Sequence, residues 1–147
     1  MRPDVKKNLD RIVGRTVVES KIGVGSFVTF LFNNIENEHS DLDWYLWVQH
    51  VGWRFESVTE ILLTSEYLDR SSAKIFVNNL IGTRITKILC SSLSHDFDMH
   101  FDNGLIFRIF AYEDNHSDYT SWELFTSENE VIEVGPGRLV KIVPRDG

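Results

Sequence analysis

The sequence has 147 residues but only one cysteine, Cys90, and three prolines. A single cysteine excludes an internal disulfide framework, and it excludes zinc or iron–sulfur sites that need several thiolate ligands. The chain also lacks any run of about 18 apolar residues, so we expect no membrane-spanning helix. Residues 1–7 lack the apolar segment of a secretory signal. These absences lead us to expect a soluble, cytoplasmic protein.

Basic residues are nearly absent from one long stretch of the chain. The whole sequence has a net charge of −7, and residues 96–133 contain ten acidic side chains but only one basic one, Arg108. Nucleic-acid binding requires a basic surface, so this stretch argues against direct contact with DNA or RNA. An acidic surface instead attracts a cationic partner and speeds its association. The competing interpretation is that the acids only keep the protein soluble.

Aromatic residues are abundant, with ten Phe, four Trp and four Tyr. This number is ample for a hydrophobic core, and it excludes general disorder. In the segment 44–47, strand alternation places Trp44 and Leu46 on one face and Tyr45 and Trp47 on the other. If the first pair faces the core, helices either cover the second pair or leave it exposed as an anchor for a partner.

The two halves of the chain resemble one another, over residues 9–63 and 80–143. In each half, a segment that ends in glycine is followed by several short apolar strands. A Trp-x-Leu strand occurs in both halves, at Trp44 and at Trp122. Such halves would form one continuous sheet or two packed sheets, and chance similarity between β-rich segments is the alternative.

Two short helices are expected. Pro3 at a first helical position, Val5, Leu9 and Ile12 at helical spacing, and Gly14 as a stop predict the first. The second is predicted from a serine cap, apolar residues at helical spacing and a terminal glycine: Ser71 or Ser72, then Ala73, Phe76, Val77 and Gly82.

The stretch Asp-Asn-Gly at 102–104 predicts a β-hairpin between two alternating strands. A two-residue Asn-Gly turn would set Arg108 opposite Met99. A three-residue loop, with its glycine in the left-handed conformation, instead sets Asp98 opposite Arg108 and collects all six apolar side chains on one face. We therefore expect the three-residue loop.

Polar stretches at 33–41 and 111–121 are predicted to be loops, and the sequence Gly-Pro-Gly at 135–137 a turn. No long linker interrupts the chain. We therefore predict a single α+β domain over 1–147, with a mainly antiparallel sheet and two short helices.

One polar cluster is a candidate for metal binding. Alternation places Asp96, Asp98 and His100 on one strand face, where a divalent metal could bind. The loop that follows offers three more ligands: Asp114, His116 and Asp118. Arg108 on the same face would instead pair with Asp98. Cys90 has no surrounding catalytic signature and is expected to be a small buried hydrophobe. We expect no metal, no cofactor and no enzymatic activity.

Four segments of the second half carry a resemblance to known proteins: 80–82, 98–105, 122–126 and 134–137. They look like segments of small bacterial domains of uncharacterised role. Such domains resemble the immunity proteins encoded beside bacterial polymorphic and contact-dependent inhibition toxins. The resemblance implies a protein that acts by binding, and that blocks a toxin domain such as a basic nuclease. It carries over no catalytic residue.

The acidic stretch supplies the residues that we expect at the partner interface. Five are expected to steer a cationic partner: Glu113, Asp114, Asp118, Glu128 and Glu130. Two are expected to anchor it: Tyr112 and Tyr119. The main hypothesis is therefore an immunity protein that neutralises a cationic toxin domain. The alternatives are a homo-oligomeric structural or regulatory module and, less favoured, a metal-dependent enzyme.

Overall fold

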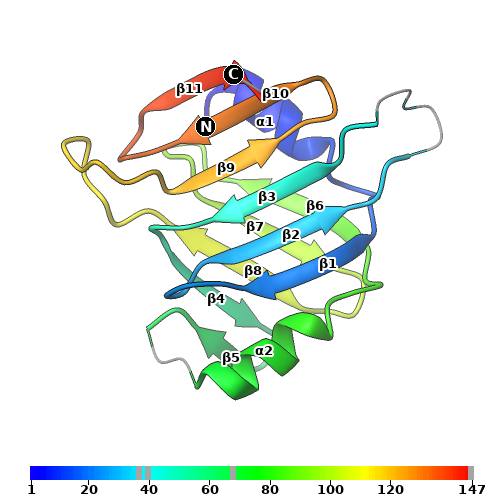
Figure 1. Ribbon diagram of the computed structural model, residues 1–147. Helices are drawn as coiled ribbons and strands as arrows, with labels where there is room; N and C mark the ends of the chain where they lie inside the picture. Colours follow the sequence, from blue (N-terminus) through cyan, green and yellow to red (C-terminus); the bar gives the residue numbers. More distant parts are fainter. Residues whose placement is uncertain (36–37, 39–40, 67–68, 146–147) are drawn as a thin grey trace.

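Two antiparallel sheets packed face to face make up the computed structural model, which describes residues 1–35, 38, 41–66 and 69–145 (Figure 1). The six-stranded sheet contains, in spatial order, β1 (Val17–Ile22), β2 (Val28–Phe32), β3 (Trp44–Val48), β9 (Trp122–Phe125), β10 (Glu130–Val134) and β11 (Val140–Pro144). The five-stranded sheet contains β5 (Ile61–Thr64), β4 (Gly52–Glu56), β8 (Ile106–Phe110), β7 (Phe97–Phe101) and β6 (Ile85–Cys90). The expected α+β class is confirmed. The two halves of the chain together form two packed sheets, and each sheet contains strands from both halves.

Two short helices lie beside opposite edges of the sandwich, one at the top and one at the bottom of Figure 1. Helix α1 (Pro3–Asp10) begins with Pro3 as expected, buries Val5 and Leu9, and contacts β6. Helix α2 (Arg70–Asn78) contacts β1. In the described part of the chain, neither helix has the length and apolar character needed to cross a membrane.

The start of α2 differs from the expected serine cap. Asp69 is the N-cap residue, and the Ser72 hydroxyl donates a hydrogen bond to its carboxylate over 2.8 Å. The prediction of a serine cap was wrong because the serines lie inside the first turn. There Ser72 orients the aspartate instead of capping the helix itself.

The two halves repeat the same order of elements: a helix, a three-stranded meander, and a hairpin that belongs to the other sheet. The junctions after the helices match closely. The amide of Gly14 donates to the carbonyl of Ile85, and the amide of Gly82 donates to the carbonyl of Val17, each over 2.8 Å. Both glycines have φ near +90°. Among the described residues of the first half, no strand corresponds to β11.

Trp53 and Trp122 occupy equivalent places in the two halves. Each lies near the start of the strand with which its half of the chain enters the other sheet. The indole Nε1 of Trp53 donates to the loop carbonyl of Ser26 over 2.7 Å, and that of Trp122 donates to the loop carbonyl of His95 over 3.2 Å. The sequence comparison matched Trp122 with Trp44, which lies one strand before its structural equivalent, Trp53. Trp44 lies in β3, which pairs directly with the strand of Trp122.

The core lies between the sheets and is dominated by phenylalanine. The ring of Phe107 lies 4.6 Å from Phe55 and 5.4 Å from Phe30, measured between centroids, so side chains of both sheets interdigitate. Cys90 is half-buried at the margin of this core, and burial raises the pKa of its thiol.

The hairpin at 102–104 has the expected register. The amide of Phe101 donates to the carbonyl of Leu105 over 2.9 Å, and Gly104 has φ of 86°. Asp98 lies opposite Arg108 in the ladder between β7 and β8. The three-residue loop is therefore confirmed.

Candidate functional site

Large apolar side chains lie on the outer face of the six-stranded sheet. This sheet is the one in front in Figure 1. Neither helix of the described chain packs on this face, because α1 and α2 contact the edge strands β6 and β1. Cross-strand pairing aligns an apolar row across five strands: Leu31, Tyr45, Phe125, Val131 and Val143. An outward sheet face usually carries polar residues, so this row requires an explanation.

Trp47 extends the apolar row toward the start of β9. Its ring centroid lies 4.5 Å from that of Phe125, and Phe125 lies 6.2 Å from Tyr45 in an edge-on contact. The Trp47 side chain is 37% exposed, whereas the other three tryptophans are at most 1% exposed. We call Tyr45, Trp47 and Phe125 the aromatic row.

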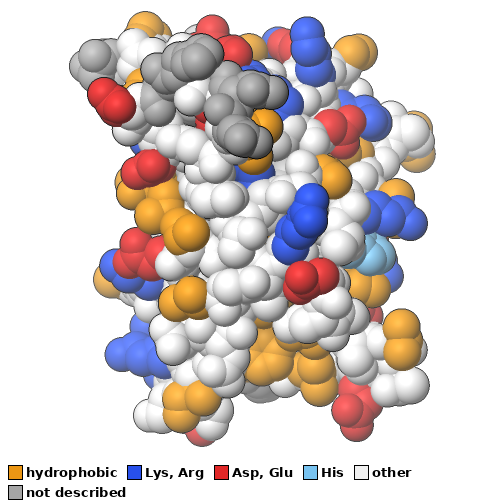
Figure 2. Space-filling view, turned by 90° about the vertical axis from the view of Figure 1, so that its right-hand side faces the viewer, with side chains coloured by type: hydrophobic (Ala, Val, Ile, Leu, Met, Phe, Trp, Pro, Cys, Tyr) orange, Lys and Arg blue, Asp and Glu red, His pale blue; other side chains and the backbone are white. Residues whose placement is uncertain are grey.

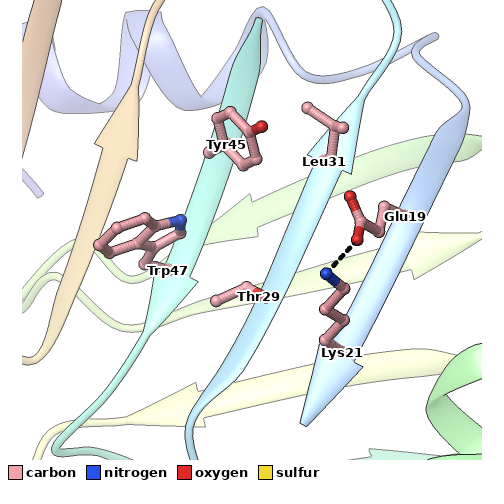
Figure 3. A pocket seen from close by; sticks show the side chains of 6 residues that line it. All are labelled: Glu19, Lys21, Thr29, Leu31, Tyr45 and Trp47. Atoms are coloured by element: carbon pink, nitrogen blue, oxygen red, sulfur yellow. Dashed lines mark ion pairs between the residues drawn. The ribbon is translucent and has the colours of Figure 1, made fainter. Parts of the chain in front are cut away.

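A shallow depression of about 200 Å³ lies beside the aromatic row (Figure 3). Tyr45 and Trp47 form one wall, and Thr29 and Leu31 of β2 lie at its floor. On the opposite wall, the ion pair between Glu19 and Lys21 projects from β1. The depression is partly open to solvent, so a side chain of a larger molecule can enter it.

Two carboxylates lie opposite one another in the ladder next to Trp47. Glu123 pairs in register with both Trp47 and Glu133. Burial and the like charge of Glu133 raise the pKa of Glu123, while a 2.9 Å hydrogen bond from Gln49 Nε2 opposes the shift. Among the described residues, no Lys, Arg or His lies within ion-pair distance of either carboxylate.

The acidic loop, residues 111–121, leads into β9 and projects to the left in Figure 1. Tyr112 and Tyr119 are exposed on it, as are Asp114 and Asp118. The ring of Tyr119 lies 4.3 Å from that of His50, between centroids, so this tyrosine rests on the turn after β3. The loop therefore lies at the same end of β3 and β9 as Trp47.

Glu113 completes the acidic loop and is partly exposed. Burial and the nearby carboxylates of Glu113 and Glu66 raise the pKa of Tyr112. The other two expected interface residues, Glu128 and Glu130, lie after β9, at its opposite end. Glu128 forms an ion pair with Arg11 over 3.0 Å. The structure therefore brings together the five expected residues of the loop, but it places Glu128 and Glu130 elsewhere.

The end of the sandwich that faces right in Figure 1 has a mixed surface. Figure 2 shows acidic and basic side chains interspersed across this end, and neither kind gathers into a patch. Acidic side chains therefore do not concentrate at this end of the molecule.

Of the candidate metal ligands, Asp98 and His100 lie on the outer face of β7, and Asp114, His116 and Asp118 lie in the acidic loop. On β7, Arg108 engages Asp98 over 2.8 Å as expected. Asp96 accepts a hydrogen bond from the amide of Ala111 over 2.9 Å. Burial, followed by the charge of Lys87, lowers the pKa of His100. In the described parts of the chain, no group of three His, Cys, Asp or Glu side chains is arranged to hold a metal.

Sequence alternation identified Tyr45 and Trp47 as neighbours on one face, but it missed Phe125 and Glu123. Those two residues join the site only because β3 pairs with β9, a contact between residues more than 70 positions apart. The combined face can hold an apolar group between aromatic rings and a cationic group beside two carboxylates. No family model matches this chain, and no match was found among curated proteins or solved structures.

Proposed function

We propose that this chain is a non-catalytic binding protein, and that the outer face of its six-stranded sheet recognises a protein partner. The observation that carries the proposal is the aromatic row, in which Trp47 is exposed and which neither helix of the described chain covers. Aromatic side chains that are half-buried in a free surface are typical anchors of protein interfaces, because they bury large areas at little entropic cost. Keeping such side chains in contact with water disfavours the free protein, and a partner relieves that cost.

Charge indicates what kind of partner fits. The acidic loop borders the face, and Glu123 and Glu133 add two carboxylates within it. A cationic protein would be steered toward this end and would neutralise charges that repel one another. Fast association through the acids and slow release through the aromatic row are the two properties that an inhibitor needs.

Within this proposal, the resemblance of the second half to immunity proteins suggests the partner. It is a toxin domain, basic and of the nuclease type, which the protein binds and neutralises in the bacterial cytoplasm. The competing proposal is a homo-oligomer in which the same face meets a second copy of the chain.

Site-specific photocrosslinking tests the binding face. A photoreactive phenylalanine analogue is placed at Trp47, at Tyr112 in the acidic loop, or at Phe110 on the five-stranded sheet, and each variant is irradiated in its host. We expect a crosslink from position 47 to one basic protein, a weaker one from 112, and none from 110. Crosslinking from 110 alone, or from 47 to a second copy of the chain, would overturn the proposal.

A growth assay then tests neutralisation. The crosslinked partner, expressed alone, is expected to arrest growth, and coexpression of the wild-type chain is expected to restore it. Trp47→Ala should fail to restore growth, while Phe110→Ala should restore it fully. A partner that leaves growth unaffected would contradict the immunity function, even if it binds the aromatic row.

A further inference from the structure

One end of the aromatic row already holds a guanidinium group. The Arg145 side chain lies over Tyr45 and Phe125, with its Cζ atom 5.7 and 5.6 Å from the two ring centroids. Its Nη1 also donates to the carbonyls of Asp43 over 2.5 Å and Thr126 over 2.9 Å. The row therefore binds a cation within the chain itself, through ring faces and oxygen acceptors.

The other end of the row has similar chemistry, and no basic side chain of the described residues forms an ion pair there. There Trp47 packs against Phe125, and the carboxylates of Glu123 and Glu133 replace the carbonyl acceptors. Carboxylates bind a guanidinium or ammonium more strongly than carbonyls do, because attraction between opposite charges adds to the hydrogen bonds. This end therefore adds attraction between opposite charges to the ring contacts and oxygen acceptors that hold Arg145.

The nearby basic side chains of the described chain do not fill this end. Lys21 forms its ion pair with Glu19, on the wall of the depression opposite Trp47. Lys141 lies opposite Glu133 in the ladder, yet it forms no ion pair within 4.0 Å of either carboxylate in the described chain. The raised pKa of Glu123 has burial and Glu133 as its causes, and no cation opposes them.

We infer that Trp47, Glu123 and Glu133 form a receptor for one basic side chain, arginine or lysine, of the protein partner. The inference rests on the proposed function, since a protein partner must deliver the side chain. The cation stacks on the exposed Trp47 ring and pairs with the two carboxylates, in the same way that Arg145 stacks on Tyr45 and Phe125. One basic residue at the centre of the partner's interface then adds specificity to the general attraction of the acidic loop.

The receptor can be tested on the isolated protein by NMR. The probe is N-acetyl-arginine amide, and its control is the citrulline analogue, which has a similar shape and no charge. The indole N–H resonance of Trp47, assigned with Trp47→Phe, reports binding. We expect a saturable shift of this resonance with the arginine probe and none with citrulline. Equal shifts with both probes, or no saturable shift, would overturn the inference.

Charge-removing variants give a second readout. Glu123→Gln and Glu133→Gln are each expected to weaken binding of the arginine probe about two- to fivefold, the factor typical of one exposed charge pair. Glu60→Gln, which removes an exposed carboxylate just before β5 in the other sheet, should leave the affinity unchanged. The indole resonances of the buried tryptophans show that each variant is folded. Equal affinity in all three variants would contradict the receptor.

Failure of the receptor and failure of the proposed function give different results with the partner. If the receptor is wrong, Glu123→Gln leaves partner affinity unchanged while Trp47→Ala still weakens it. If the binding face is wrong, Trp47→Ala also leaves partner affinity unchanged.

Discussion

Replacing Arg15 should destabilise the fold strongly, because this arginine is buried and holds the connection between β2 and β3. Its side chain is 1% exposed. Nε donates to the carbonyl of Arg11 over 2.8 Å, Nη1 donates to that of Asn33 over 3.1 Å, and Nη2 pairs with the Glu38 carboxylate. The guanidinium also stacks on Trp44, 4.5 Å from the ring centroid.

The magnitude follows from what Arg15→Met would leave behind. The Glu38 side chain is 11% exposed, so its carboxylate would remain in a poorly solvated place without its cation. Removing one partner of a buried ion pair costs about 3–5 kcal/mol, and the lost bonds to two carbonyls are included in that range. A small domain has only about 5–15 kcal/mol of stability, so the variant should be close to the folding threshold.

Urea denaturation followed by far-UV circular dichroism measures the effect. We expect Arg15→Met to lower the free energy of unfolding by about 3–5 kcal/mol, and Arg15→Met/Glu38→Gln to recover a large part of that loss. The recovery is the critical result, because it separates an unpaired buried charge from simple loss of packing. A single variant that costs under about 1 kcal/mol, or a double variant no more stable than the single one, would refute the reasoning.

Three further predictions concern the repeated architecture and the carboxylate pair. Trp53→Phe and Trp122→Phe should each lower the free energy of unfolding by about 1–2 kcal/mol in urea denaturation, because each loses one buried hydrogen bond and some core volume; a large difference between them would contradict their equivalence. Gly14→Ala and Gly82→Ala should each cost about 1–2 kcal/mol, since both positions have φ near +90° and neither lacks space for a Cβ; thermal unfolding of the pair checks this. The raised pKa of Glu123 means that the folded protein keeps a proton which the unfolded chain has already released. Stability should therefore fall as pH rises from the unfolded to the folded pKa, and Glu123→Gln should remove this part of the decline in a series of melts. An unchanged pH dependence would contradict the assigned environment.

Local features were predictable from the sequence. The register of the hairpin at 102–104 followed from the requirement that all apolar side chains share one face and that Asp98 meet Arg108. The first helix followed from Pro3 and the spacing of its apolar residues. In both cases, residues close in sequence determine the geometry.

Long-range arrangement was not predictable, because strand alternation indicates a face but not a sheet. Trp44 and Trp53 both show an inward alternating pattern, yet they belong to different sheets. The hairpin that crosses between sheets in each half is determined by packing of the whole core rather than by a local signal. The sequence match between the halves was displaced for this reason.

In the candidate site, too, local features were predictable from the sequence and long-range arrangement was not. Alternation placed Tyr45 and Trp47 on one face, but it could not determine whether a helix covers them. The acidic stretch looked continuous in sequence, and β9 separates it into two ends of the sheet. Glu128 consequently lies beside Arg11 rather than with the acidic loop.

The central claim is that a partner binds the aromatic row, and titration calorimetry with the crosslinked partner tests it most directly. Trp47→Ala is compared with Phe110→Ala, which removes an exposed aromatic side chain from the opposite sheet. We expect Trp47→Ala to weaken binding about 30-fold, as loss of an interface anchor worth about 2 kcal/mol would, and Phe110→Ala to have no effect. Unchanged affinity for Trp47→Ala, or an equal loss for Phe110→Ala, would contradict the account.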